Sequence, residues 1–526
     1  MKNILQGLYA FSYKFVRILS LILMVCLFLS AFLFTCYATD MESQKVLTKA
    51  DNPLINILGT LLFISILAII SHFVCKKPQR YKRILLFAVL GLCTAEGIIL
   101  ILFGKTVPAA DCMSVYSMAQ SLASGDTAVV HPTASYLSYY PQQVGLMAFF
   151  EGIIRLLNLF RISYPAYHFI KCINVALVCM IILFQYKTVH LLWNNDRADC
   201  IYLLLAGFNL PLVFYSSFVY GEIPSFAAVS LGIYYLFKWL HTAKDCSARR
   251  ALLYACVSVL ALSASVMLRK NSLIIIIAVL LVVLCRWLQT RKAVILIYGL
   301  LCALCCFSIL PLIRAGYENR AGRTLSSGVP AMSYFAMGMQ ESSRGNGWYN
   351  GFNFNTFQES GMNTAVTVQK SREAIAERLA YFQENPGYAA DFYLHKYLSQ
   401  WADGTYACRQ ATLATFGGRR AFFDSLYEGK YSYLVISYCN IYQNVLYLGA
   451  LLFCIIGLLK KTDACAFGLT TYLGFIGVIG GFLFHMIWEA NSRYIFLYGL
   501  LLLPYAARGI VWFMERLIIM PAPENS

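Results

Sequence analysis

Long apolar segments alternate with short polar ones along most of the chain. The apolar segments are about 20 residues long, the length at which an α-helix crosses the ~30 Å hydrocarbon layer of a membrane. The pattern predicts an all-α polytopic membrane protein with about 12 transmembrane helices. The expected helices cover residues 15–37, 54–75, 84–104, 166–186, 200–219, 223–241, 251–268, 271–288, 293–313, 434–459, 464–486 and 493–513.

The composition supports this class of protein. Hydrophobic residues make up 59% of the 526 positions and charged residues only 13%, whereas an ordinary soluble domain has about 25% charged residues. A water-soluble enzyme is therefore excluded. Most of the 18 cysteines lie inside apolar segments. A cysteine there behaves as a small apolar residue, so we expect neither a disulfide framework nor a cysteine metal site.

The basic residues indicate the orientation of the chain in the membrane. A net charge of +17 would suggest nucleic-acid binding in a soluble protein, but here Lys and Arg lie mainly in short loops. Cytoplasmic loops carry an excess of Lys and Arg, so we expect both termini in the cytoplasm and no nucleic-acid partner. The predicted parts are residues 1–104 (three helices), 105–165 (outside), 166–313 (six helices), 314–430 (outside) and 431–526 (three helices and a cytoplasmic tail).

The two long external segments should have structures of their own. Residues 142–160 have helical spacing, but charges at Glu151 and Arg155 interrupt it, which favours a helix lying in the membrane interface. Residues 314–430 contain a predicted soluble helix from 364 to 384, ended by Asn385-Pro386-Gly387. A segment this long is more than a connector, so it predicts a small extracytoplasmic subdomain.

Asp111 is the first candidate for chemistry. It lies about seven residues beyond the outer end of the third expected helix. A carboxylate at this position could accept a proton from a substrate hydroxyl while a lipid-borne partner is held beside it. The alternative is an aspartate that caps a helix or faces solvent in a loop.

Arg269 and Lys270 stand beside Asn271 in a short turn on the same expected face. The insertion bias disfavours cations there, and two cations with an amide suit a phosphate or pyrophosphate. The alternative is an external turn whose charges meet lipid headgroups.

Two further turns carry carboxylates to this face. Glu222 stands in Tyr220-Gly-Glu-Ile-Pro224, where helix capping is the simpler explanation. The last external turn contains His485, Glu489, Arg493 and Tyr494, a combination also typical of an interfacial anchor. The four features are far apart in sequence, yet the topology assigns all of them to the outer face, and this convergence is the main argument for a site.

Glu96 and Lys171 lie inside expected helices at similar depth. A charge within a membrane span requires a partner. We therefore expect these two side chains to pair with each other and to stabilise the helix bundle.

These motifs together resemble the GT-C superfamily of integral membrane glycosyltransferases, in particular the bacterial relatives of glycosyltransferase family 39 and protein mannosyltransferases. The matching text is Asp111 with Gly125-Asp126 and Tyr140-Pro141-Gln142, then Val219 to Pro224, Leu268 to Asn271, and Glu489 to Tyr494. The order and sidedness of the motifs make the set more specific than any one of them.

The resemblance implies transfer of a sugar from a polyprenyl-phosphate donor to an extracytoplasmic acceptor hydroxyl on a glycan, teichoic acid, lipid or protein. It implies Asp111 as general base and Arg269, Lys270 and Arg493 as ligands of the donor phosphate. Supporting roles would fall to Glu222, Glu489, His485, Tyr494, Tyr140 and Gln142.

The chain departs from the family pattern in two ways. Its acidic loop follows the third helix instead of the first, and Asp111 is followed by Cys112 instead of a second acid. Two adjacent carboxylates would hold a divalent cation better than one, so a metal requirement stays open. Glu222 and Glu489 could complete such a site.

Other functions fit the same architecture. A transporter or flippase of lipid-linked saccharides would also need many helices, although internal repeats typical of transporters are not evident. A polymerase or ligase of surface polysaccharide is a further alternative. The sequence contains no P-loop and no dinucleotide fingerprint, which favours a lipid-linked donor over a nucleotide sugar.

Overall fold

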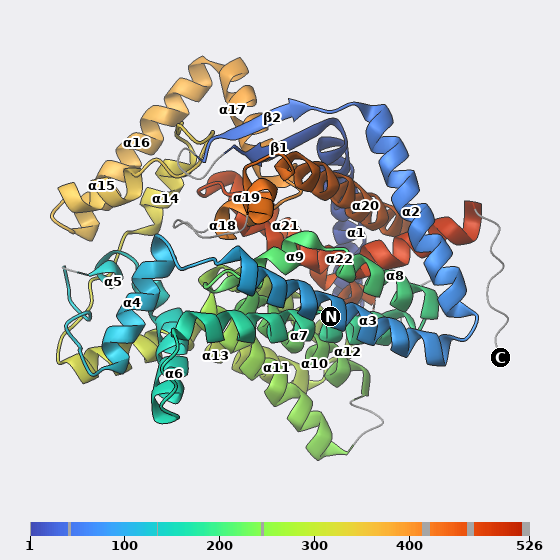
Figure 1. The fold of residues 1–526 in the computed structure, drawn as a ribbon, viewed down its shortest axis with the longest axis horizontal. Helices are drawn as coiled ribbons and strands as arrows, with labels where there is room; N and C mark the ends of the chain where they lie inside the picture. Colours follow the sequence, from blue (N-terminus) through green and yellow to red (C-terminus); the bar gives the residue numbers. More distant parts are fainter. Residues whose placement is uncertain are drawn as a thin grey trace.

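Helices form nearly all of the structure, a computed structural model that describes residues 2–39, 44–133, 135–242, 247–412, 421–459 and 468–517 (Figure 1). In these residues 11 helical segments are long and apolar enough to cross a membrane, and the predicted all-α polytopic class is confirmed. They are α1 (Lys2–Leu33), α2 (Pro53–Cys75), α3 (Pro78–Ile99) with η1 (Leu100–Gly104), α7 (Ala166–Trp193), α10 (Glu222–Thr242), α11 (Ala248–Leu268), η3 (Lys270–Ser272) with α12 (Leu273–Thr290), α13 (Ala293–Ala321), α20 (Ser432–Leu459), η4 (Gly468–Tyr472) with α21 (Leu473–Ile487), and α22 (Ser492–Leu517). The predicted tail beyond Leu517 lies outside the described residues.

The prediction of one continuous helix over 200–219 is wrong. This segment forms two buried helices, α8 (Asp196–Gly207) and α9 (Leu210–Tyr215). The side chain of Asn209 accepts a hydrogen bond from the Leu212 amide and so begins α9, while Pro211 has no amide hydrogen with which to continue α8. An N-cap residue followed by proline was the signal for this break.

The α8–α9 pair runs alongside α3 in the same direction. Asp199 accepts a hydrogen bond from Lys82 near the start of α3. A side chain added at Gly207 would contact Val89, and one added at Gly97 would contact Ser216. The broken segment therefore extends along most of α3 although neither half is long enough to span a membrane alone.

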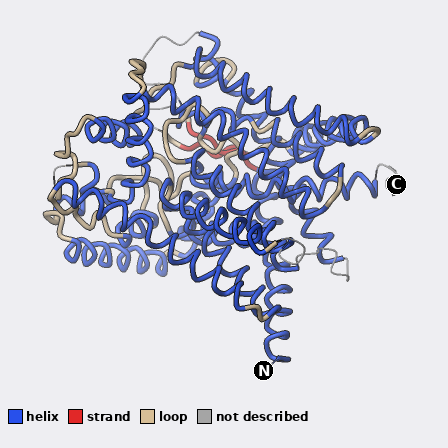
Figure 2. Tube along the Cα trace, turned by 90° about the horizontal axis from the view of Figure 1, so that it is seen from below, coloured by secondary structure: helices blue, strands red, loops and turns tan. Residues whose placement is uncertain are grey.

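The first helix ends earlier than the pattern predicts. Residues expected to continue it form β1 (Phe34–Ala38), which pairs in antiparallel register with β2 (Val46–Ala50). The hairpin rests on the end of α17, because the Cys36 amide donates to the carbonyl of Ala402. Figure 2 shows both strands inside the molecule, with α1 projecting from it toward the N-terminus.

The first predicted external segment folds into α4 (Asp111–Ala123), α5 (Tyr136–Tyr139), η2 (Pro141–Gln143) and α6 (Val144–Leu159). The expected helix over 142–160 is thus present as α6. Its buried Glu151 accepts hydrogen bonds from Arg155, Tyr317 and Arg320. This network joins α6 to the end of α13.

The second segment contains α14 (Ala331–Gly338), α15 (Phe352–Glu359), α16 (Thr364–Glu384), α17 (Pro386–Trp401), α18 (Cys408–Thr412) and α19 (Ala421–Tyr427). The boundaries of α16 are those predicted, since Asn363 caps its start and Pro386 opens the next helix. Residues of α14, α16 and α17 share a small hydrophobic core around Phe382 and Phe392. In Figure 1, α14–α17 and α4–α6 lie at the same end of the molecule.

The expected Glu96–Lys171 pair does not form. Lys171 is fully buried, and its ammonium group donates to the carbonyl of Thr106, 2.8 Å away. Glu96 is half-exposed. The reason is local, since a carbonyl at the unwound end of α3 can accept this hydrogen bond without an acid.

The contact between α3 and α8 gives a stability prediction. Asp199 is fully buried and accepts from Lys82 at 2.8 Å, whereas the side chain of Asp196, the other partner of Lys82, is 44% exposed. Asp199→Asn should lower the free energy of unfolding by on the order of 3 kcal/mol, because it breaks a buried charge pair. The measurement is thermal unfolding of the purified protein in detergent.

Asp196→Asn is the matched control, with an expected loss below about 1 kcal/mol because an exposed ion pair contributes little. Equal losses in the two variants would contradict a special role for the buried partner.

Candidate functional site

Two arginines bracket a fully buried glutamate where α10 begins. Glu222 is 0% exposed, and its Oε1 accepts a hydrogen bond from Arg269 Nη1. Arg493 Nε lies 3.5 Å from the same oxygen. A side chain on Gly221 would collide with the carbonyl of Leu268, so glycine is what lets the two turns approach. One carboxylate with two guanidinium groups leaves a net positive charge in a largely buried position.

Aromatic rings surround this cation pair. The guanidinium carbon of Arg493 lies 5.7 Å from the ring centres of Phe218 and Tyr220 and 5.5 Å from that of Tyr494. Arg269 lies 5.5 Å from the Tyr494 ring. Such contacts hold a guanidinium plane in place while its remaining N–H groups stay available for an anion.

Glu489 is the second buried carboxylate of the site. It lies in the turn between α21 and α22, 8% exposed, and accepts a hydrogen bond from the Tyr494 hydroxyl at 3.3 Å. Burial raises its pKa to about 7, against the opposing effect of Arg493, and the charge of Asp111 raises it further. The group therefore changes its protonation near neutral pH.

A glycine-rich loop of the second segment covers this turn. The amide of Ala490 donates to the carbonyl of Gly347 at 2.7 Å. Gly347 has a φ of 72°, and a Cβ there would lie 2.7 Å from Lys396 Cε, so the loop fits only without a side chain. Lys396 itself is fully buried and donates to the carbonyl of Gly338. Burial lowers its pKa to about 7, partly opposed by Glu489.

Asp111 is the first residue of α4 and is exposed. The residue before it, Ala110, has φ 48° and ψ −127°, a region that costs a residue with a side chain about 1–3 kcal/mol and is often found at functional sites. The carboxylate is thus presented at the end of a strained turn, where an incoming molecule can reach it.

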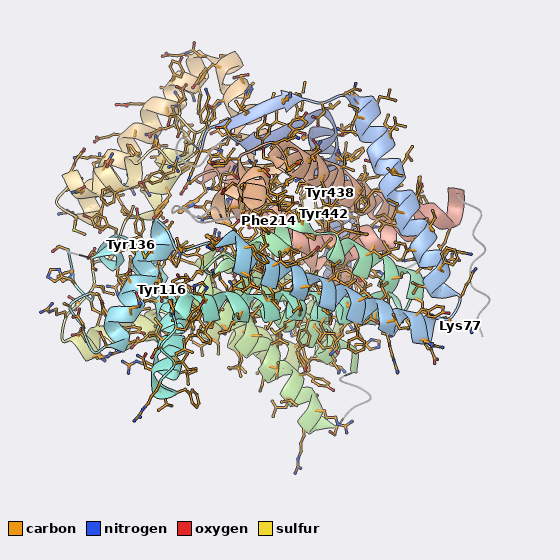
Figure 3. The ribbon with its side chains drawn as sticks, in the orientation of Figure 1. Lys77, Tyr116, Tyr136, Phe214, Tyr438 and Tyr442 are labelled. Carbon is orange, nitrogen blue, oxygen red and sulfur yellow. The ribbon has the colours of Figure 1, made fainter. Side chains whose placement is uncertain are left out.

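Four tyrosines lie within electrostatic range of Asp111. Burial raises the pKa of each, and the charge of Asp111 adds to this effect. They are Tyr136 (labelled in Figure 3), Tyr140, Tyr220 and Tyr349. The Gln143 side chain donates to the Tyr220 hydroxyl at 2.5 Å. Asp111 and Glu489 therefore belong to one electrostatic cluster with a phenol-rich wall.

The structure brings together most of the residues singled out in the sequence. Asp111, Glu222, Arg269, Glu489, Arg493, Tyr494 and Tyr140 form this cluster. Lys270 is exposed and forms no ion pair with a described carboxylate, which separates it from its neighbour. The contact with Tyr220 is made by Gln143, whereas Gln142 makes no such contact.

His485 is fully buried behind the cluster, with its ring centre 5.8 Å from that of Tyr494. Neither ring nitrogen has a hydrogen-bond partner among the described residues. It supports Tyr494 by packing.

Tyr136, Gln143, Tyr349 and Lys396 were not predicted as residues of the site, and Tyr220 was named only within a motif. Tyr349 lies inside the glycine-rich, aromatic stretch of 345–353, and that composition was the available signal. Lys396 lies inside an ordinary helical pattern, which contains no hint that its side chain would be buried.

The carboxylates of the cluster are poorly arranged to bind a divalent cation. Glu222 is engaged by Arg269 and Arg493, which makes it a poor metal ligand. No group of three or more His, Cys, Asp or Glu side chains in the described part of the chain could hold a metal ion. The idea that Glu222 and Glu489 would complete a metal site with Asp111 therefore gains no support from these contacts.

Comparison with known proteins places the chain in a family. Residues 8–507 match the family described as "Conserved hypothetical integral membrane protein". The chain belongs to this family. The match to these integral membrane proteins includes every residue of the cluster described above. No curated protein matches the chain.

Among solved structures, the chain is similar to the apo crystal structure of the Archaeoglobus fulgidus oligosaccharyltransferase, with 13% sequence identity and a TM-score of 0.45. The similarity covers 84% of this chain and 53% of the archaeal one. The chain thus spans about half the length of that protein.

Proposed function

We propose that this membrane protein is a glycosyltransferase that moves a sugar from a polyprenyl-phosphate donor to an acceptor hydroxyl on the extracytoplasmic side. The observation that carries the proposal is the buried pair Arg269 and Arg493, held by Glu222 beside the exposed carboxylate of Asp111. These groups combine an anion site with a proton acceptor. The arginines stand where helices that could cross a membrane begin or end, and Asp111 follows seven residues after the end of another such helix.

The arginine pair suits the phosphate of the donor. Arg493 Nε makes no hydrogen bond with the described residues, and the charge of Glu222 cancels only one of the two cations. A polyprenyl phosphate carries its charged head at the membrane surface while its chain stays in lipid. Fixed guanidinium groups stabilise the negative charge that grows on the phosphate as it leaves.

Asp111 suits the acceptor. The acceptor oxygen attacks the anomeric carbon, the bond from that carbon to the phosphate oxygen breaks, and the hydroxyl proton passes to the Asp111 carboxylate. Free polyprenyl phosphate is the second product. Asp111 is exposed whereas Glu489 is buried, so Asp111 is the carboxylate that an acceptor from outside can reach.

The assay that tests the proposal supplies purified protein with polyprenyl-phosphate sugars and candidate glycan, lipid or protein acceptors. Release of free polyprenyl phosphate that depends on an acceptor supports transfer. A transporter or flippase would move the lipid without releasing it, and a polysaccharide polymerase or ligase would act only with a saccharide acceptor linked to a lipid.

Loss of the proton acceptor should abolish most of the activity. Asp111→Asn keeps the size of the side chain and is expected to lower turnover by roughly 10² or more. Asp126→Asn is the matched control, because Asp126 is also exposed and lies just beyond the other end of α4. Near-normal turnover of Asp111→Asn would exclude Asp111 as the base.

Loss of a phosphate ligand should weaken donor use. Arg493→Ala should cost about 1.5–3 kcal/mol in transition-state stabilisation, or some 10- to 150-fold in kcat/KM for the donor. Arg493→Lys should not restore full activity, since an ammonium group lacks the planar fork of a guanidinium. The measurement is a donor titration at saturating acceptor.

Lys270→Gln is the control for charge alone, because Lys270 adjoins Arg269 but is exposed and outside the cluster. A loss as large as that of Arg493→Ala would show that surface charge, and not the buried pair, attracts the donor.

The sidedness of the site can be tested separately. In a background without other reactive cysteines, Ser114→Cys in α4 should react with a membrane-impermeant thiol reagent in intact cells. Gln79→Cys, in the first turn of α3, should react only after permeabilisation. The reverse pattern would overturn the extracytoplasmic location.

A further inference from the structure

A groove opens where α2 and α3 meet. It has a volume of about 490 Å³ and is lined by Phe73 and Lys76 at the end of α2 and by Tyr81, Ile84, Leu85 and Ala88 of α3. This volume lies within the range of sites that hold a small molecule. In Figure 1 the two helices diverge from their shared turn. The groove is therefore a wedge with apolar walls and a basic mouth.

The mouth of the groove has an excess of positive charge. Lys76, Lys77, Arg80 and Arg83 are all exposed, and none is ion-paired with a residue that the structure describes. Lys82 differs from them, because Asp196 and Asp199 neutralise it. The ammonium group of Lys76 lies 4.8 Å from the Phe73 ring centre, which holds a cation at the apolar wall.

We propose that this groove binds an anionic phospholipid. One acyl chain would lie between Phe73 and Ile84, which are 57% and 54% exposed, and the phosphate would lie among Lys76, Lys77 and Arg80. Charge complementarity favours this occupant, since a phosphate diester supplies the negative charge that the turn lacks, and its chain covers apolar side chains without displacing packed ones.

This site is separate from the proposed catalytic cluster. Lys77 and Tyr136 are labelled at opposite ends of the molecule in Figure 3. The proposal does not rest on the proposed function, and it holds whether or not the chain transfers a sugar. The two sites share one element, because α3 starts at the groove and its far end leads through η1 toward Asp111.

Native mass spectrometry of the purified full chain tests the proposal. Phosphatidylglycerol should be retained over phosphatidylcholine. The triple substitution Lys76→Gln, Lys77→Gln and Arg80→Gln should lower that retention by at least about tenfold, because it removes the cations nearest the phosphate. All three side chains are exposed, so the variant should fold normally, and its unfolding temperature checks this.

Two further variants separate a defined site from general surface charge. Ala88→Trp fills the groove without changing charge and should also reduce retention. Arg249→Gln, Arg250→Gln and Lys292→Gln remove three exposed cations at the starts of α11 and α13 and should leave retention unchanged. Any of three results would overturn the proposal. These are equal losses in the two triple variants, equal retention of both lipids, and full retention by Ala88→Trp.

A competition experiment identifies the source of the phosphate. Glycerol phosphate at millimolar concentration should not displace the lipid, because it lacks the chain. Displacement would show that the turn binds phosphate alone, which contradicts a lipid site.

Discussion

The site depends on the burial of one carboxylate between two guanidinium groups. Glu222 is fully buried, and a buried charge is tolerated only when it is paired and hydrogen-bonded. Its partners come from two other turns, the α11–α12 junction with Arg269 and the start of α22 with Arg493. Three helix junctions far apart in sequence are thereby fixed at one point. Glu222 compensates only one of the two cations. The second lies beside Glu489, which burial keeps partly uncharged near pH 7, so the point stays suitable for an anion.

Segments between the spanning helices add the remaining groups of the site. The turn after α21 carries Glu489 beside Arg493, and the loop with Gly347 pairs with that turn through the Ala490 amide. Burial then brings the pKa values of Glu489 and Lys396 to about 7. The loop contributes to this burial, and removing water disfavours the charged forms of both groups. A segment outside the spanning helices in this way influences the chemistry of a site at their ends.

Helix α3 connects the two ends of the molecule. Near its start Lys82 is bound by Asp196 and Asp199, and at Gly97 it packs closely against α7 and the residue after α9. Beyond its end, Thr106 is bound by Lys171, five residues before Asp111. Buried hydrogen bonds near the start of α3 and beyond its end therefore fix the position of the proposed base. The surrounding structure also holds Ala110 in its strained conformation.

The sequence by itself determined the class of fold, 11 of the expected spans, the boundaries of α16 and the motifs that meet at the site. These follow from hydrophobic period, caps and charge, which are local properties. The tertiary structure decided that α8 and α9 are separate helices and that Lys171 binds a carbonyl instead of Glu96. It also decided that Arg269 faces Glu222 while Lys270 is exposed, and that Lys396 is buried. Each depends on which surfaces meet, and adjacent residues with the same charge cannot be told apart until a neighbouring helix supplies the partner for one of them.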